Sequence, residues 1–204
     1  MSDPGKREYF NSLAPRWDAM PWPADRDARV ADFCRRALPP AAAVILDAGS
    51  GTGLLAPHLL TQPGNSPALV VELDYALAML QASAAKHGNG RVAHVCGDAL
   101  RLPFGDATMD AVLCFGILPH LGDPGRAVRE LWRVLRPAGA IAVGHLLGSA
   151  ELNRRHREIG GPVGGDTLLP GDELAEMLRG LGASEVEAED SPACYLVCAR
   201  KGGR

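Results

Sequence analysis

The feature that most constrains the fold of this chain is the segment Val44–Gly53. An apolar run there ends at Asp47 and Ala48 and is followed at once by Gly49-Ser50-Gly51-Thr52-Gly53. A glycine-rich turn lets the backbone approach a ligand closely at the carboxyl edge of a sheet, where open α/β folds bind ligands. The dinucleotide fingerprint is Gly-x-Gly-x-x-Gly, but here the third glycine comes one residue early and Leu54 takes its place. The segment therefore predicts a ligand-binding turn that differs from a nicotinamide dinucleotide site.

The rest of the chain alternates strand and helix patterns. Nearly continuous apolar runs indicate strands that are covered on both faces of a sheet. We predict such strands at Val44–Ala48, Ala68–Leu73, Arg91–Val95, Ala111–Phe115 and Ala140–Leu147, helices at Leu54–Thr61, Tyr75–His87, Pro124–Leu135 and Asp172–Leu181, and two closing strands at Ala183–Ala188 and Ala193–Arg200. This order predicts one α/β domain over residues 1–204, a three-layer sandwich with a seven-stranded, mostly parallel sheet whose last strand is antiparallel.

Charge and hydropathy exclude several classes of partner. The 21 basic and 24 acidic residues give a formal net charge of −3, which argues against a general nucleic-acid binder. No apolar run approaches the roughly 20 residues that cross a bilayer. The first ten residues, MSDPGKREYF, lack the apolar core of a signal peptide. We therefore expect no membrane span and a cytoplasmic location.

The cysteines do not form a metal-binding pattern. They are five in number and contain no Cys-x-x-Cys pair, so we predict no metal site. Reduced thiols that act as small hydrophobic side chains are one interpretation, and methyl-accepting or metalloid-binding thiols are the other. The residues concerned are Cys34, Cys96, Cys114, Cys194 and Cys198.

Five motifs in the expected order resemble the class I S-adenosylmethionine-dependent methyltransferases. They are the Asp47–Gly53 turn; Val70–Asp74 with Met79-Leu80; Gly97-Asp98-Ala99 with Leu102-Pro103-Phe104; Asp110-Ala111-Val112 with Phe115-Gly116-Ile117; and Leu135-Arg136-Pro137-Ala138-Gly139. The resemblance implies a Rossmann-like fold, S-adenosylmethionine as the cofactor, S-adenosylhomocysteine as its product, and a small-molecule methyl acceptor. The chain lacks the Asn/Asp-Pro-Pro-Tyr motif of amino methylases and the Lys-Asp-Lys-Glu set of ribose methylases.

The same resemblance implies where the cofactor binds. The implied contacts come from the glycine-rich turn and from the ends of the next strands. They are Asp47, Ala48, Gly49, Ser50, Gly51, Thr52, Gly53, Glu72, Leu73, Asp74, Met79, Gly97, Asp98, Ala99, Phe115 and Gly116. Two acids compete for the ribose, because either carboxylate can accept hydrogen bonds from both hydroxyls. The spacing to Met79 favours Asp74 over Glu72.

The N-terminal residues Tyr9–Asp18 resemble the Phe-Asp-x-x-Ala-x-x-Tyr-Asp opening of the ubiquinone- and menaquinone-type methyltransferases. That resemblance implies that residues 1–25 cover the cofactor, with Trp17 close to the cationic sulfonium. The alternative is an amphipathic helix that packs on the sheet edge through Phe10, Leu13 and Trp17. Both interpretations can hold together.

The acceptor side offers three histidines as candidate catalytic bases: His120, His145 and His156. A base is required only if the acceptor must lose a proton before it attacks the methyl group. Each histidine also has a structural alternative, as a packed loop, core or solvated side chain. We expect an irregular stretch at Gly148–Leu169, with residues 148–170 serving as a substrate lid. Its Arg154, Arg155 and Arg157 would suit an anionic acceptor.

Two other functions compete with methylation of a small molecule. One is a thiol or metalloid methylase that uses the chain's own cysteines. The other is a protein that binds S-adenosylmethionine without catalysis. The sequence leaves open whether the protein is a monomer or a homodimer, and it does not name the acceptor.

Overall fold

The computed structural model describes residues 3–39, 41–61, 67–88 and 90–203. Within these residues, seven strands form one sheet in the order β3-β2-β1-β4-β5-β7-β6. The strands are β1 (Val44–Ala48), β2 (Leu69–Asp74), β3 (Val92–Cys96), β4 (Met109–Phe115), β5 (Leu135–His145), β6 (Ala183–Ser191) and β7 (Cys194–Lys201). Strands β1 to β5 pair in parallel, whereas β7 pairs antiparallel with both β5 and β6. The predicted mostly parallel sheet with an antiparallel last strand is confirmed.

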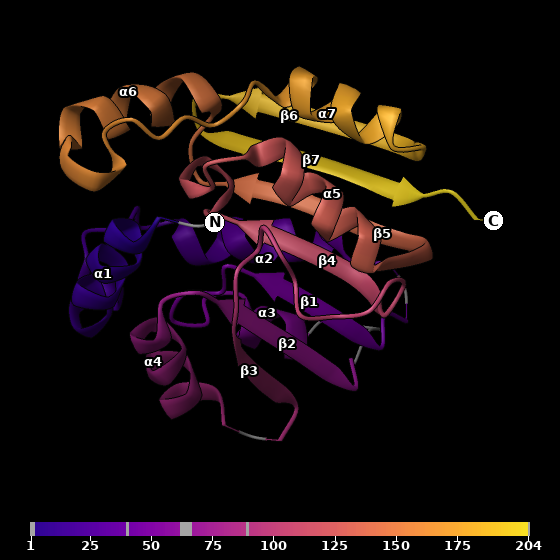
Figure 1. Cartoon of the computed structure of the whole chain (residues 1–204), viewed down its shortest axis with the longest axis horizontal. Coiled ribbons are helices and arrows are strands. Elements are labelled where there is room, and N and C mark those ends of the chain that lie inside the picture. Colours follow the sequence, from indigo (N-terminus) through magenta and orange to yellow (C-terminus); the bar gives the residue numbers. More distant parts are fainter. Residues whose placement is uncertain (1–2, 40, 62–66, 89, 204) are drawn as a thin grey trace.

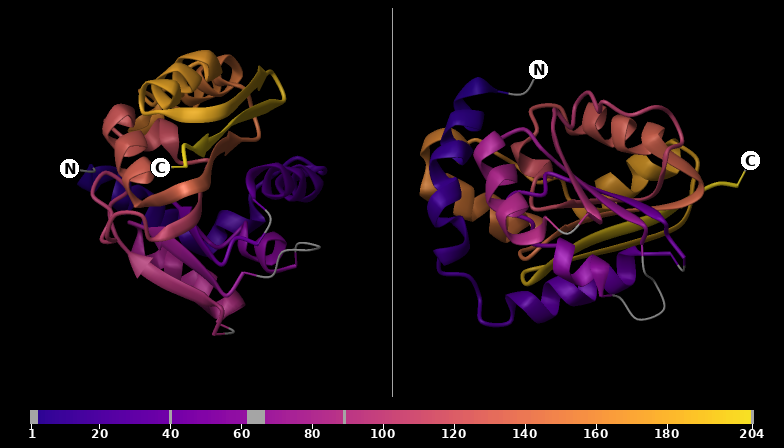
Figure 2. Two further views of the ribbon diagram at one scale, coloured as in Figure 1. Left: turned by 90° about the vertical axis from the view of Figure 1, so that its right-hand side faces the viewer. Right: turned by 90° about the horizontal axis from the view of Figure 1, so that it is seen from below.

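Helices cover both faces of the sheet. One core cluster joins β1, β4 and β5 to helices on one face through Leu131 and Leu174, and a second joins the same strands to the other face through Phe33 and Leu59. Figure 2 shows the resulting layers, with α5 and α2 on opposite sides of the strands. The helices are α1 (Pro4–Leu13), α2 (Arg26–Ala37), α3 (Ala56–Leu60), α4 (Leu77–His87), α5 (Pro124–Val134), α6 (Ser149–Ile159) and α7 (Gly171–Gly180), with short 3₁₀ turns η1 (Ala14–Ala19), η2 (Leu118–His120) and η3 (Gly161–Val163).

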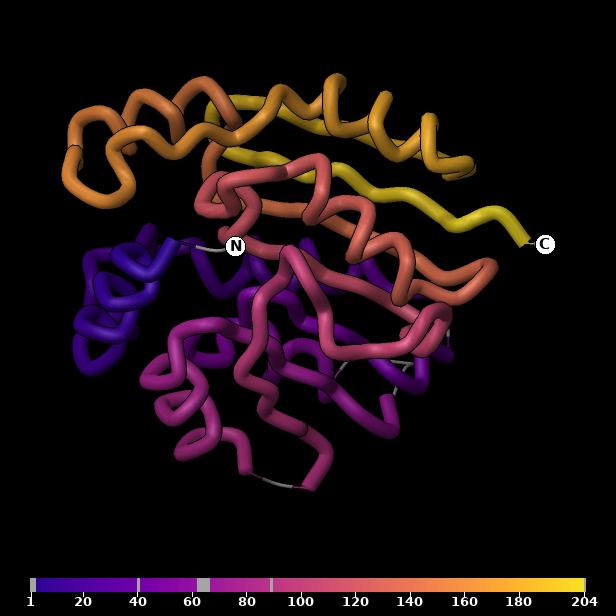
Figure 3. Tube along the Cα trace, in the orientation of Figure 1, coloured from indigo at the N-terminus to yellow at the C-terminus, as the bar shows by residue number. Residues whose placement is uncertain are grey.

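Two helices lie beyond the carboxyl ends of the parallel strands. Figures 1 and 3 show α1 and α6 at the edge of the molecule opposite the C-terminus. Helix α1 also contacts η3, which follows α6 in the chain. The strand order reverses between β1 and β4, and open α/β sheets bind ligands outside the carboxyl ends of strands at such a point. The two helices therefore flank the expected ligand position.

The expectation of an irregular stretch at Gly148–Leu169 was wrong, because α6 occupies half of it. Leu152 and His156 lie one turn apart on the helix and are both buried. Asp190 accepts hydrogen bonds from the backbone N–H and the hydroxyl of Ser149, at 2.8 and 2.6 Å, and so satisfies donors at the first turn. The helix ends at Gly160, whose φ is +68°. The glycines after it suggested a loop, but they begin only where the helix stops.

Several predicted bounds shift, and helix α2 was missed in addition to α6. Helix α2 precedes the first strand and buries Val30, Phe33, Cys34 and Ala37, which have the spacing of one helical face. The helix predicted at Leu54–Thr61 is confined to α3. The proline- and glycine-containing sequence at Pro63–Pro67 predicts a further irregular stretch, which lies outside the described residues except for Pro67. These differences leave the strand order unchanged.

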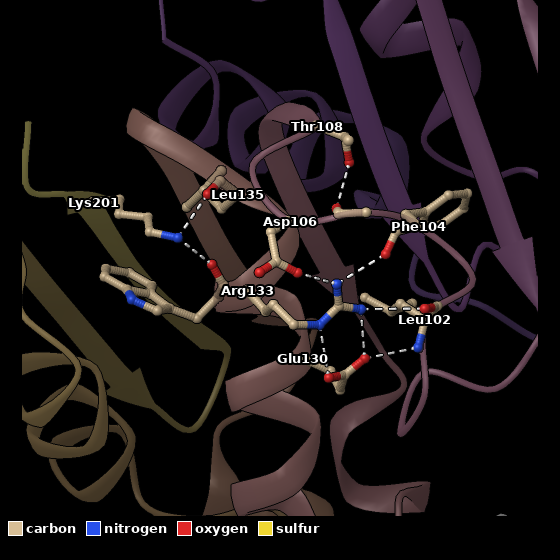
Figure 4. Close-up of polar contacts among 10 residues, drawn as sticks. Leu102, Phe104, Asp106, Thr108, Glu130, Arg133, Leu135 and Lys201 are labelled. Carbon is tan, nitrogen blue, oxygen red and sulfur yellow. Dashed lines mark hydrogen bonds and ion pairs between the residues drawn. The ribbon is translucent and has the colours of Figure 1, made fainter. Parts of the chain in front are cut away.

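An arginine on α5 fixes the loop between β3 and β4 (Figure 4). The Arg133 guanidinium donates to the carbonyls of Leu102 and Phe104, at 3.2 and 2.9 Å, and to both carboxylate oxygens of Glu130. Glu130 in turn accepts from the backbone N–H of Leu102 at 3.0 Å. Because one planar fork holds two carbonyls and a carboxylate, the loop that begins at Gly97 is held against the helix.

Candidate active site

The glycine-rich turn after β1 adopts a backbone that other residues rarely adopt. Gly49, Gly51 and Gly53 have φ values of +78°, +55° and +83°. A Cβ built on Gly49 would lie 2.3 Å from the Ile117 side chain, whereas one on Gly51 would have nothing within 4 Å. The turn is thus tightly packed against the segment after β4 at one end and open at its middle. That opening lets a ligand reach the backbone.

The two competing acids at the end of β2 have different surroundings. Glu72 is fully buried, accepts a hydrogen bond from the Ser83 hydroxyl, and lies 3.3 Å from His94. Asp74 is half-buried at the strand end and accepts from the N–H groups of Gly51 and Ala76, at 2.9 and 2.8 Å. Burial raises the pKa of both carboxyl groups. Of the two, Asp74 is the one at the mouth of the glycine-rich turn.

Three buried oxygen atoms in or beside this turn lack a hydrogen-bond partner among the described residues. They are Asp47 Oδ2, Ser50 Oγ and Glu72 Oε1, and the last lies 3.0 Å from a Cβ built on Gly53. Burial, together with the nearby Glu72 and Asp74, raises the pKa of Asp47 well above its ordinary value. An unpaired buried polar atom costs about 1–3 kcal/mol, so a ligand that carries hydrogen-bond donors would gain affinity here.

The other predicted cofactor residues gather at the same edge. Gly97 donates its N–H to the Asp74 carbonyl at 3.0 Å, and the Asp98 carboxylate accepts from Leu100 N–H at 2.8 Å. Thr52 donates its hydroxyl to Asp18 at 2.6 Å, which joins the turn to the N-terminal segment. The remaining predicted positions are buried or half-buried in this region: Ala48, Leu73, Met79, Ala99, Phe115 and Gly116.

The N-terminal segment is helical, as the alternative interpretation predicted, but helix α1 ends at Leu13 and Trp17 lies in the 3₁₀ turn η1. Leu13 is buried, and Phe10 and Trp17 pack beside it against Met79 of α4, rather than on the sheet edge. The Phe10 ring meets the Trp17 and His120 rings edge-on, at centroid distances of 6.1 and 5.1 Å. The segment thus links α4 to the segment after β4. A contact of Trp17 with the cofactor stays a prediction.

Side chains from three distant segments meet beside α1, at the side where the sequence predicts the acceptor. His120 Nδ1 lies 2.6 Å from Asp166 Oδ2, and Lys6 of α1 forms an ion pair with the other oxygen of the same carboxylate. His156 Nδ1 lies 3.0 Å from the Asp166 carbonyl, and its ring centroid is 5.2 Å from that of His120. Burial opposes ionisation of Asp166, but His120 and Lys6 outweigh it and lower the pKa of the carboxyl.

The three candidate histidines therefore differ in their surroundings. His145 Nδ1 accepts the N–H of Leu147 at 2.9 Å, and burial lowers its pKa to about 4, so this ring is neutral and held by the backbone. Burial also lowers the pKa of His156, which holds the Asp166 backbone. His120 contacts a carboxylate instead. Sequence reasoning missed Asp166 and Lys6, because no local motif marks either residue.

Arg154 and two of the five cysteines are less available to a ligand than the sequence suggested. Arg154 is paired with Glu151 and Glu158 on its own helix. Burial raises the pKa of Cys34, and that of Cys114 to about 12, so both thiols stay protonated. In the described part of the chain, no cluster of three metal-ligating side chains occurs, and no helix has the length and apolar character needed to cross a membrane.

Comparisons with known proteins identify the family of this chain. The family described as "Methyltransferase domain" matches residues 46–143. The chain is 34% identical over 145 residues to a demethylmenaquinone methyltransferase of Roseiflexus sp. (strain RS-1), a match that covers 67% of the chain and 60% of that relative. It is 31% identical over 204 residues to the demethylmenaquinone methyltransferase of Deinococcus radiodurans, covering 86% of the chain and 83% of the relative.

Solved structures show the same fold. A chain from the complex between the Haloferax volcanii Trm112 methyltransferase activator and a putative methyltransferase superposes with a TM-score of 0.79 at 18% identity, covering 97% of this chain and 98% of that one. The match to the Roseiflexus relative spans only 60% of its length. Similarity alone therefore does not give this chain the activity of that whole protein. The chain belongs to the S-adenosylmethionine-dependent methyltransferases, in the branch that contains its demethylmenaquinone methyltransferase relatives.

Proposed function

We propose that this protein transfers a methyl group from S-adenosylmethionine to a small-molecule acceptor. The single observation that carries the proposal is the open glycine-rich turn with Asp74 at its mouth and the unpaired Asp47 and Ser50 oxygens beside it. When bound, the cofactor supplies an activated methyl group on a sulfonium, so the protein has to provide orientation, desolvation and charge placement. The residues at this edge of the sheet fit those tasks.

The donor and acceptor groups of the turn match the polar parts of the cofactor. Asp74 would accept hydrogen bonds from the ribose hydroxyls, because its half-buried carboxylate lies at the strand end, whereas Glu72 is enclosed by Ser83 and His94. Asp47 Oδ2 would accept from the ammonium group, since a buried carboxylate oxygen without a partner favours a cation. The Gly97–Ala99 segment would border the adenine, and Arg133 holds the loop that contains it.

The acceptor would enter between α1 and α6, above the ends of β4 and β5. We propose that residues 1–25 and 148–170 exclude water from the sulfonium there, as cover and lid of one domain. The names of the relatives support an acceptor related to demethylmenaquinone. Arg155 and Arg157 are exposed on α6 and would contact an anionic acceptor. We also propose that the protein is cytoplasmic and is a monomer or a homodimer.

Mass spectrometry tests this function directly. Purified protein is incubated with S-adenosylmethionine and a panel of small acceptors that includes short-chain demethylmenaquinol, and S-adenosylhomocysteine and methylated products are measured. We expect S-adenosylhomocysteine to accumulate with at least one acceptor. Binding of S-adenosylhomocysteine without turnover across the panel would instead support a protein that binds the cofactor without catalysis.

A further inference from the structure

We propose that Asp47 and Glu72 hold one proton between them in the ligand-free protein, and that Asp47 releases it when the ammonium group of the cofactor binds beside it. Glu72 thereby sets the pH range of cofactor binding without touching the cofactor. This inference rests on the proposed function and deepens it, because it names a positioning residue for the cofactor and couples cofactor binding to the release of a proton.

Asp47 and Glu72 are neighbours in the sheet. Asp47 of β1 is the register partner of Glu72 of β2, and Glu72 is the register partner of His94 of β3. Register partners in parallel strands place their side chains on the same face, with the strands about 4.7–4.9 Å apart. Both acids are closed off from solvent, with relative exposures of 1% for Asp47 and 0% for Glu72. Two buried carboxylates so close together repel each other, so the pair favours a state with one proton.

The surroundings of the two acids favour the proton on Asp47. Glu72 Oε2 accepts a hydrogen bond from the Ser83 hydroxyl and lies 3.3 Å from His94 Nε2. Both neighbours oppose the rise that burial causes in the pKa of Glu72. Asp47 Oδ2, in contrast, has no hydrogen-bond donor among the described residues. Because donors stabilise a carboxylate, the acid without one is the better place for the proton.

The titratable groups that face Asp47 bring no positive charge. Burial raises the pKa of Asp47 well above its ordinary value, and the nearby Glu72 and Asp74 raise it further. The thiols of Cys34 on α2 and Cys114 on β4 also lie near Asp47, and burial keeps both protonated. The titratable groups around Glu72 are Asp74, His94 and, on α4, Lys86 and His87. In the described part of the chain, no cationic side chain bonds to the free oxygen of Asp47, so a ligand has to supply its counter-charge.

The acid pair borders the glycine-rich turn that would hold the cofactor. One residue separates Asp47 from Gly49, the first glycine of the turn. At the other end of the turn, a Cβ built on Gly53 would lie 3.0 Å from Glu72 Oε1, which also has no hydrogen-bond partner among the described residues. A buried carboxylic acid in this position ionises when a cation arrives, because the cation stabilises the carboxylate.

The exchange balances in atoms and charge. The O–H bond of the Asp47 carboxyl group breaks, its electron pair stays on the carboxylate, and the proton passes to water or to the buffer. One positive charge leaves the site as a proton and one arrives as the ammonium group, so the net charge beside Glu72 stays the same. Because protons compete with the cofactor for Asp47, affinity should rise with pH, by up to about tenfold per pH unit for one released proton.

Calorimetric titration in buffers of different ionisation enthalpy counts the protons released on binding. The probe is S-adenosylhomocysteine, which carries the same ammonium group as the cofactor. At pH 6 and 7 we expect the wild-type protein to release about one proton per molecule bound. Asp47→Asn should release almost none, and its affinity should change little between the two pH values. Glu72→Gln should release fewer protons than the wild type, because Asp47 ionises more readily without an acidic neighbour.

Two controls separate Asp47 from Asp74, since burial also raises the pKa of Asp74. The first is 5′-methylthioadenosine, which has the adenine and the ribose but no ammonium group, and which should bind without proton release. The second is Asp74→Asn, which should weaken binding of S-adenosylhomocysteine but keep the proton release. Asp74 already accepts the N–H groups of Gly51 and Ala76, and these donors favour its ionised form.

Infrared difference spectra give a readout that does not require the variants to bind. The ligand-free wild-type protein at pH 7 should show the C=O band of a protonated, buried carboxyl group, S-adenosylhomocysteine should remove it, and ligand-free Asp47→Asn should lack it. Persistence of this band in Asp47→Asn, binding of S-adenosylhomocysteine without proton release, or equal release with 5′-methylthioadenosine would overturn the inference. Absence of S-adenosylhomocysteine binding to the folded wild-type protein would instead overturn the proposed function, and this inference with it.

Discussion

The two halves of the site are built in different ways. The proposed cofactor half is built mainly from backbone: three glycines with positive φ and main-chain N–H groups, to which the Asp74 carboxylate is added at a strand end. The acceptor half consists of side chains from α1, the segment after β4 and the segment after α6, brought together only by the fold. Under the proposed function, the first half would bind the cofactor through fixed backbone geometry, whereas exchange of side chains in the second half would change the acceptor.

The largest effect on stability and binding should come from a substitution in the glycine-rich turn, which belongs to the backbone half. Gly49→Ala forces a Cβ to within 2.3 Å of Ile117 at a φ of +78°. We expect it to lower the free energy of unfolding by about 2–4 kcal/mol and to weaken S-adenosylhomocysteine binding at least tenfold. Chemical denaturation and calorimetry measure the two quantities.

The matched control for that variant is Gly90→Ala. Gly90 has nearly the same φ, +77°, but a Cβ there would have no atom of another described residue within 4 Å apart from its chain neighbours. It should retain wild-type affinity. If Gly49→Ala also binds normally, the packed turn is not what holds the cofactor.

A smaller effect on cofactor affinity should distinguish the two acids of β2. Asp74→Ala should weaken S-adenosylhomocysteine binding by about 1–3 kcal/mol, the range for hydrogen bonds to a charged group. Glu72→Ala should weaken it clearly less, because Glu72 is fully buried and bonded to Ser83. Isothermal titration of both variants gives the order, and the reverse order would assign the ribose to Glu72.

The pH dependence of stability tests the unpaired Asp47. Burial raises the pKa of Asp47 in the folded protein, so the folded state binds a proton more tightly than the unfolded state. Stability from this group is therefore present at pH near 4 and is lost as the pH rises through the raised pKa. Because Asn cannot ionise, we expect the ligand-free Asp47→Asn variant to lose less stability as the pH rises. At pH 8 the difference in the free energy of unfolding should be about 1–2 kcal/mol. Thermal unfolding of both proteins from pH 5 to 8 measures this pH dependence. If stability changed with pH equally in both proteins, Asp47 would not have the raised pKa.

The smallest effect concerns the contact between the two covering segments. Lys6→Met removes the ion pair with Asp166. We expect amide exchange to accelerate about fivefold in α1 and in residues 161–168, equivalent to ~1 kcal/mol. Hydrogen exchange with S-adenosylhomocysteine bound reports both segments. Arg179→Met, which removes an exposed pair with Glu176, should change neither.

The same contrast explains what the sequence could predict. The strand order and the glycine-rich turn follow from local patterns, since a turn with positive φ requires glycine where it occurs. The sequence alone leaves the choice between Glu72 and Asp74 open, because both residues lie on the same face of one strand, and their different burial and partners arise only in the fold. Asp166 was missed because its partners, Lys6 and His120, are 160 and 46 residues away. Helix α6 was missed because the glycines that follow it suggested a loop.

Calorimetric titration of the wild-type protein with S-adenosylhomocysteine and with NAD tests the central claim most directly. The glycine-rich turn, Asp74 and the unpaired Asp47 oxygen should give saturable one-site binding of S-adenosylhomocysteine. NAD should give none, because the third glycine of its fingerprint is replaced by Leu54. Binding of NAD with equal affinity, or no binding of S-adenosylhomocysteine to the folded protein, would contradict the account.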